Sequence, residues 1–221
     1  MTHPRVRIAF FLAVICAACA QIATDSPTND GLLVWQPPKL QFPHTLPPPT
    51  VSKEIITTLR VAAVPIILEE TKLEDVKTRL GGSIGQRGDA SEFLEWLCFY
   101  GTDANGRWGL WLESSEMGGG WVDGFALERL GRNARTDRRC RMIREGEGGI
   151  ELPIALRLDL TEMQVRKILG KPTVRYRSTL IFDHEHQETI RNEPATVSNT
   201  VAVALRDGVV WAIQVWKDST S

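Results

Sequence analysis

The chain has 221 residues, and 26 basic residues against 27 acidic ones give it a formal net charge of −1. This balance argues against nucleic-acid binding, which requires a strongly basic surface. After residues 1–20, no stretch is long and apolar enough to predict a membrane-spanning helix.

Residues 1–20 have the features of a signal peptide. Arg5 and Arg7 form a basic start, an apolar stretch too short to span a bilayer follows, and Ala18-Cys19-Ala20 fits a cleavage site. We therefore expect export, to the periplasm or out of the cell. An alternative is lipidation at Cys19, which would anchor the protein at the outer membrane, although Cys16 stands where a lipidation motif usually has leucine.

Residues 21–53 are predicted to be a disordered tether. Six prolines fall within thirteen positions and favour an extended polyproline II spacer over a packed element: Pro37, Pro38, Pro43, Pro47, Pro48 and Pro49. Such a spacer suits a lipid-anchored protein that needs reach, and it equally suits a plain disordered N-terminus.

Residues 54–130 predict a first unit of helix plus sheet. Thr71 and Glu74 form a capping box, Leu73 and Val76 share one helical face, and Gly81 ends the helix. Strands are expected at 93–100, 108–113 and 121–129, because these segments are rich in aromatic and β-branched residues.

Residues 151–218 predict a second unit, after a basic connector at 131–150. Thr161 and Gln164 form a capping box, and Gly170 with Pro172 ends the helix. Strands are expected at 177–182, 200–206 and 209–216. Asp207-Gly208 between the last two is a strong hairpin signal.

The two units are related by a nearly constant offset. Val76 and Val165 lie 89 positions apart, and Phe125 and Ile213 lie 88 apart. An internal repeat of this length indicates one supersecondary unit used twice. We therefore predict an α+β fold of two tandem units, each a short helix packed on an antiparallel meander sheet.

Cys98 and Cys140 are the only cysteines after the leader. Two cysteines in an exported chain most often form a disulfide. The alternative is two separate buried thiols. A metal site needs more ligands than two cysteines supply, so we expect no metal there.

Two segments resemble known families. Residues 158–172, LDLTEMQVRKILGKP, and the hairpin at 204–216 resemble the tandem-repeat beta-lactamase inhibitor proteins and the related BamE-type (SmpA/OmlA) lipoproteins of outer-membrane barrel assembly. The resemblance implies helix-plus-sheet repeats that bind another protein. Family members usually carry glycine where Asp159 stands and methionine where Leu160 stands, and the inhibitors typically hold one disulfide in each repeat.

No catalytic constellation is evident. His184 and His186 are spaced for one face of a strand and could contribute to a metal site, but a solvated loop is the favoured interpretation. An enzyme using Glu113, Glu116 and this histidine pair remains an alternative. We expect no enzyme activity, no cofactor and no metal.

The tryptophans are more informative. Strand alternation places Trp111 and Trp216 on the sheet face away from the helices. Exposed tryptophan is typical of a binding hot spot, although curled sheets or a covering linker would make the same residues core. The predicted partner-binding residues are Trp111, Trp216, Glu113, Glu116, Met117 and Gln214.

These observations predict an exported, non-catalytic protein-binding module. Its expected role is that of an inhibitor or immunity-like protein that acts on an envelope or secreted enzyme through an aromatic sheet face. The alternative is an envelope assembly or scaffold lipoprotein, similar to the barrel-assembly subunit.

Overall fold

The computed structural model describes residues 33–43, 45–49, 55–89, 92–190 and 193–220. The expected signal peptide and Cys19 lie outside these residues. Of the described residues, 49% are in strands and 10% in helices. The fold is therefore a mainly antiparallel β fold, and the α+β class expected from sequence is wrong.

The strands and helices of the described residues are, in chain order, β1 (Leu33–Val34), β2 (Thr58–Val61), β3 (Val64–Ile67), α1 (Leu73–Leu80), β4 (Ile84–Arg87), β5 (Leu94–Asp103), β6 (Gly106–Ser115), β7 (Gly124–Arg129), β8 (Arg135–Thr136), β9 (Arg141–Met142), β10 (Ile150–Glu151), α2 (Glu162–Leu169), β11 (Val174–Tyr176), β12 (Thr179–Ile190), β13 (Glu193–Arg206) and β14 (Val209–Thr220).

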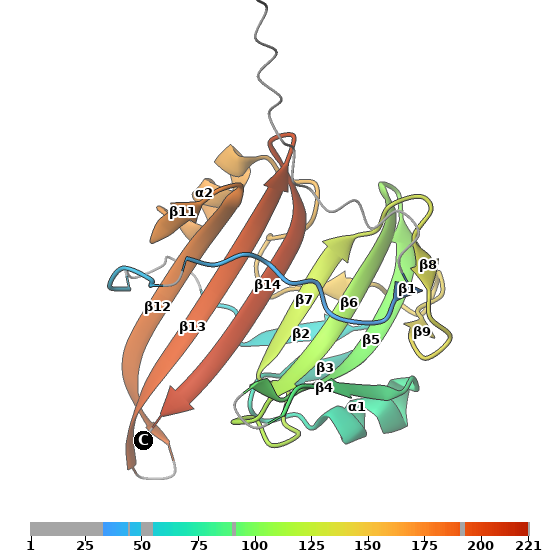
Figure 1. The fold of residues 1–221 in the computed structure, drawn as a ribbon, viewed down its shortest axis with the longest axis horizontal. Coiled ribbons are helices and arrows are strands. Elements are labelled where there is room, and N and C mark those ends of the chain that lie inside the picture. The colour runs from blue at the N-terminus through green and yellow to red at the C-terminus, as the bar shows by residue number, and fades with distance from the viewer. Residues whose placement is uncertain (1–32, 44, 50–54, 90–91, 191–192, 221) are drawn as a thin grey trace, which may run out of the picture.

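One large sheet dominates the molecule (Figure 1). Its strand order is β11-β12-β13-β14-β7-β6-β5-β4, with β9 paired to β5. The expected separate sheets are thus joined edge to edge, because β14 pairs with β7 in a register that sets Ile213 opposite Leu127. This pairing satisfies two strand edges whose backbone groups would otherwise be open to solvent or to another chain.

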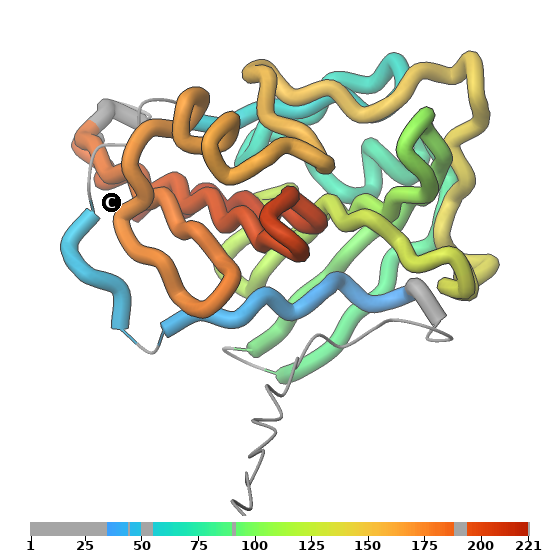
Figure 2. The backbone as a smooth tube through the Cα atoms, turned by 90° about the horizontal axis from the view of Figure 1, so that it is seen from above, coloured from blue at the N-terminus to red at the C-terminus, as the bar shows by residue number. Residues whose placement is uncertain are grey.

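The inner face of the sheet holds the main core. Alternate residues of β5, β6, β7 and β14 point inward, such as Phe99, Leu110, Phe125 and Ile213, and all four are fully buried. The helices and the small sheet β10-β2-β3 cover this face, and the segment that begins at β1 crosses the opposite, outer face (Figures 1 and 2).

Each helix has eight residues and buries one valine in the same core, Val76 in α1 and Val165 in α2. The capping box at Thr161 is confirmed, since its side chain and that of Gln164 bond reciprocally to the backbone. The box expected at Thr71 is wrong. The N-cap of α1 is Lys72, and the Thr71 hydroxyl instead accepts a hydrogen bond from the amide of Ile67 (2.9 Å).

The two helix starts are tied to the sheet by matching hydrogen bonds. The amide of Leu73 donates to the Gly120 carbonyl (3.0 Å), and the amide of Glu162 donates to the Gly208 carbonyl (3.3 Å). Gly120 lies in the turn before β7, and Gly208 lies in the turn before β14. The hairpin signal at Asp207-Gly208 is confirmed, because both residues have positive φ in the turn between β13 and β14.

The disulfide between Cys98 and Cys140 is confirmed. It ties the segment after β8 to β5, across a sequence separation of 42 residues. A loop of this length contributes about 4 kcal/mol in the chain-entropy account.

Asp159 has a φ of 67°, in the left-handed region that favours glycine. Here the Asp159 carboxylate accepts hydrogen bonds from Arg129 and from Asn105.

Candidate binding site at the end of the sheet

The outer face is not an open aromatic platform. Alternation places Trp111, Glu113 and Gln214 on this face as expected, but they are only 2%, 2% and 6% exposed. The expectation that they form an exposed binding face is therefore wrong. Residues 33–43, part of the expected tether, cross this face and cover it (Figures 1 and 2).

Trp216 is half-buried on the same face. Its ring contacts Phe42 of the covering segment edge to face, with ring centroids 5.1 Å apart. A Cβ on Gly124 would come within 2.8 Å of the Trp216 ring, so glycine in β7 gives this indole room to lie against the sheet.

The remaining predicted site residues lie at the turn between β6 and β7. Glu116 is exposed, and Met117 is 82% exposed, the highest value among the large hydrophobic residues that the structure describes. Trp121, at the far side of the same turn, is also exposed, and the Lys72 ammonium lies 4.8 Å from its ring.

Beside this turn lies a pocket of about 730 Å³. It forms where the β6–β7 turn, the end of β14 and the segment between β3 and α1 meet. Its lining residues are Glu69, Glu70, Ser115, Met117, Gly118, Trp121, Asp123, Trp216, Lys217, Asp218 and Ser219. Four of these carry a carboxyl group, and Lys217 is the one basic residue in the described lining.

Asp123 holds the base of the turn in place. One of its carboxylate oxygens accepts hydrogen bonds from the amide (2.9 Å) and the hydroxyl of Ser115. Burial raises the pKa of Asp123, and the two bonds from Ser115 partly oppose this shift. The turn is further closed by the amide of Gly120, which donates to the Ser114 hydroxyl (3.0 Å).

Glu69 forms the opposite wall. Its carboxylate accepts a hydrogen bond from the Ser219 hydroxyl (2.6 Å) and pairs with the Lys217 ammonium (3.1 Å). These contacts join the start of α1 to the end of β14. Lys217 is consequently engaged by Glu69, and the pocket keeps an excess of acidic groups facing solvent.

Glu113 lies behind the pocket on the outer face. Burial raises its pKa to about 8, a shift opposed by a hydrogen bond from Gln214 (3.4 Å) and increased by the nearby charge of Asp123. Its other carboxylate oxygen has no hydrogen-bond partner among the described residues.

The structure does not bring the alternative catalytic residues together. His184 and His186 lie in strand β12 rather than in the favoured loop, and β13, β14 and β7 separate β12 from the Glu113 strand. Within the described ranges, no cluster of three or more metal-ligating side chains is present. The described helices are also each too short or too polar to cross a membrane.

Asp123, Glu69, Lys217 and Trp121 were missed from sequence. Trp121 directly follows three glycines, a signal that would have added it to the turn. Glu69 and its partner Ser219 are 150 residues apart, so only the folded sheet reveals their contact.

Comparison with known proteins found no matching family model, no matching curated protein and no matching solved structure.

Proposed function

We propose that this chain is an exported, non-catalytic protein-binding module that inhibits or neutralises an envelope or secreted enzyme. The contact surface is the β6–β7 turn and the acidic pocket beside it. The observation that carries the proposal is the exposure of Met117 at 82% on a turn whose base is fixed by hydrogen bonds. A turn whose base is fixed loses less conformational entropy on binding than a fully free loop.

The charge of the pocket defines the partner's chemistry. Glu70 and Asp218 line it without a basic partner of their own in the described residues, and Lys217 already pairs with Glu69. A basic side chain of the partner, beside an apolar cleft that accepts Met117, complements this surface.

Export is supported by two separate features. The first is the signal-peptide pattern of residues 1–20. The second is the disulfide between Cys98 and Cys140, since disulfides persist in oxidising compartments and are rare in the cytosol.

The test is a comparison of two methionine variants in capture from envelope extract. Met117→Asp alters the turn, and Met163→Asp is the matched control because Met163 is 78% exposed on α2. We expect wild type and Met163→Asp to capture one enzyme and to inhibit its activity, and Met117→Asp to lose both by at least about tenfold. Equal capture by the two variants, or an enzyme captured without inhibition, would contradict the proposal.

The alternative function is an envelope assembly or scaffold lipoprotein, which rests on the small residues before Cys19. Metabolic labelling with a lipid precursor separates it from a soluble inhibitor. Label that disappears in Cys19→Ser supports an anchored protein, and a captured partner of the barrel-assembly machinery would favour the assembly role.

A further inference from the structure

Residues 33–43, the strap, contact the outer face of the sheet in the manner of a bound peptide. The strap runs across the strands instead of adding to their ladder (Figure 1). Only its first residues pair as a strand, where β1 lies parallel to β8 with Leu33 opposite Arg135. Pro37 is buried, and Pro38 follows it.

Trp35 is the first anchor of the strap. Its ring meets Trp96 edge to face at a centroid distance of 5.5 Å, and its carbonyl accepts a hydrogen bond from the Trp111 indole (3.2 Å). A Cβ on Gly85 would come within 2.5 Å of the Trp35 ring, so the glycine leaves the space that this ring fills.

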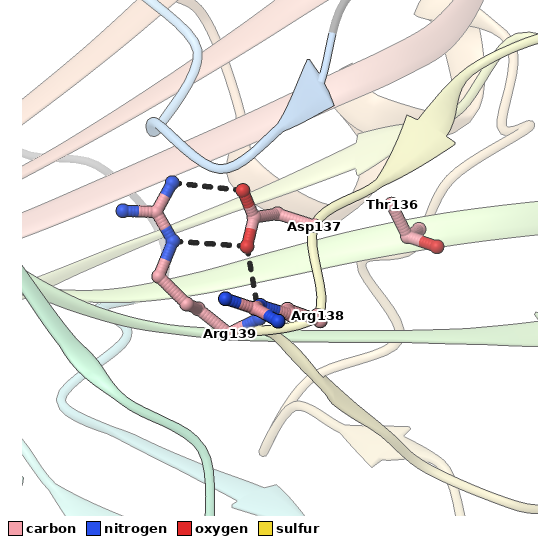
Figure 3. Close-up of a pocket in the computed structure, with 4 residues that line it drawn as sticks. All are labelled: Thr136, Asp137, Arg138 and Arg139. Carbon is pink, nitrogen blue, oxygen red and sulfur yellow. Dashed lines mark hydrogen bonds and ion pairs between the residues drawn. The ribbon is translucent and has the colours of Figure 1, made fainter.

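The outer side of Trp35 is closed by Arg139. The guanidinium lies 3.8 Å from the ring centroid, and Asp137 fixes its orientation through paired hydrogen bonds of 2.9 and 2.8 Å (Figure 3). These hydrogen bonds from Arg139 also lower the pKa of Asp137 to about 2, so Asp137 and Arg139 both stay charged over the usual pH range. The result is a formed pocket for one aromatic side chain.

Phe42 is the second anchor, seven residues along, and it packs on Trp216. Beside it the Gln41 side chain accepts a hydrogen bond from Arg177. Two aromatic side chains on either side of a proline pair thus fix an extended segment to a face that carries Trp96, Trp111 and Trp216.

The covered face combines an apolar cluster with buried polar groups. Trp35 packs against a cluster of buried residues that includes Trp96, Cys98 and Trp111. The same face carries the side chains of Glu113 and Gln214, which are 2% and 6% exposed. Burying polar groups of this kind is unfavourable, whereas the main core on the inner face of the sheet is apolar.

We infer that the outer face is a docking site for an extended, proline-containing peptide segment of a partner, with aromatic residues at positions i and i+7, and that the strap occupies this site in cis. This surface is distinct from the acidic pocket, although Trp216 contributes to both. The inference therefore stands whether or not the β6–β7 turn inhibits an enzyme.

The test uses a fluorescent peptide of residues 33–43 and the full chain. In the Trp35→Ala/Phe42→Ala double variant the strap loses both anchors while Trp96, Trp111 and Trp216 remain. We expect the peptide to bind this variant at least about tenfold more tightly than wild type, because a tethered strap competes at millimolar effective concentration. A peptide with alanine at both aromatic positions should not bind, and Trp216→Ala in the variant should weaken binding of the original peptide.

Equal affinity for wild type and variant, no binding to the variant, or equal binding of the alanine peptide would overturn the inference. Circular dichroism and a thermal scan establish that the double variant is folded. If the double variant is not folded, the same peptide titration is carried out on the single variant Phe42→Ala, and the same outcomes support or overturn the inference. If neither variant folds, the strap is an obligatory part of the core and the inference fails.

Discussion

Ala126 and Gln214 lie directly opposite each other where β7 pairs with β14. They are 88 residues apart, the same offset that separates Phe125 from Ile213 in the sequence. Each of the two residues thus pairs with its own counterpart from the other half of the chain. The β7–β14 pairing is therefore close to a local two-fold arrangement. It joins two four-strand meanders, β4 to β7 and β11 to β14, into one sheet.

We predict that Val76→Ala and Val165→Ala destabilise the protein by similar amounts, about 2–3 kcal/mol each. Both side chains are 0% exposed, and both face the same core from equivalent helices. Urea unfolding measures the effect, and Val209→Ala, at a residue 37% exposed, serves as the control with a change below about 0.5 kcal/mol. A large loss for one valine and almost none for the other would show that the helices are not equivalent.

The stability of the protein should fall as the pH rises from about 5 to about 8. The pKa of Glu113 is raised to about 8 in the folded state, from the ordinary value of 4.5, so folding favours its protonated form. The stabilisation is fully present below pH 4.5 and is lost as pH rises through 8. Glu113→Gln should remove this pH-dependent part of the unfolding free energy. Between pH 5 and pH 8 the unfolding free energy of the wild type should therefore fall by a few kcal/mol relative to that of the variant.

The measurement is urea unfolding of both proteins at several pH values. A wild-type curve that is flat between pH 5 and 8, or parallel slopes for wild type and Glu113→Gln, would show that the buried carboxyl group is ionised or solvated. Asp123, whose pKa is also raised by burial, contributes a slope of the same sign that the variant should retain.

Much of the local structure could be predicted from the sequence. The Thr161 capping box, the Asp207-Gly208 turn and the face on which Trp111 points follow from spacing, since helix caps, tight turns and strand alternation are set by neighbouring residues. The disulfide follows from the presence of two cysteines in a chain expected to be exported.

What could not be predicted depends on contacts between distant residues. Exposure of Trp111 and its burial under a linker were both open from the sequence, and only the fold shows that Trp35, 76 positions earlier, accepts a hydrogen bond from its indole. The edge-to-edge pairing of β7 with β14 likewise leaves no local signal, so two separate sheets were expected where one exists. The acidic pocket escaped detection for the same reason, because its walls come from three separate parts of the chain.

Removal of the disulfide should lower the unfolding free energy by up to about 4 kcal/mol. Cys98→Ser/Cys140→Ser is the variant, and thermal unfolding is the measurement. The segment after β8 also carries Arg139, which lies on Trp35. We therefore expect the strap to be held more weakly in the variant and the Trp111 indole to show faster hydrogen exchange.

An unchanged indole exchange rate in a destabilised variant would indicate that the strap is held independently of this segment. Reduction of the wild-type protein with a thiol reagent provides the matched control, because it opens the same bond without changing the sequence.

The most direct measurement is photo-crosslinking from position 117 with a benzophenone amino acid in envelope extract, with position 163 as the comparison. The two methionines are 82% and 78% exposed, so non-specific collisions affect both equally. The account predicts one dominant crosslinked enzyme from position 117, absent from position 163 and suppressed by Glu70→Lys/Asp218→Lys. Crosslinks of the same identity and yield from both positions would contradict it.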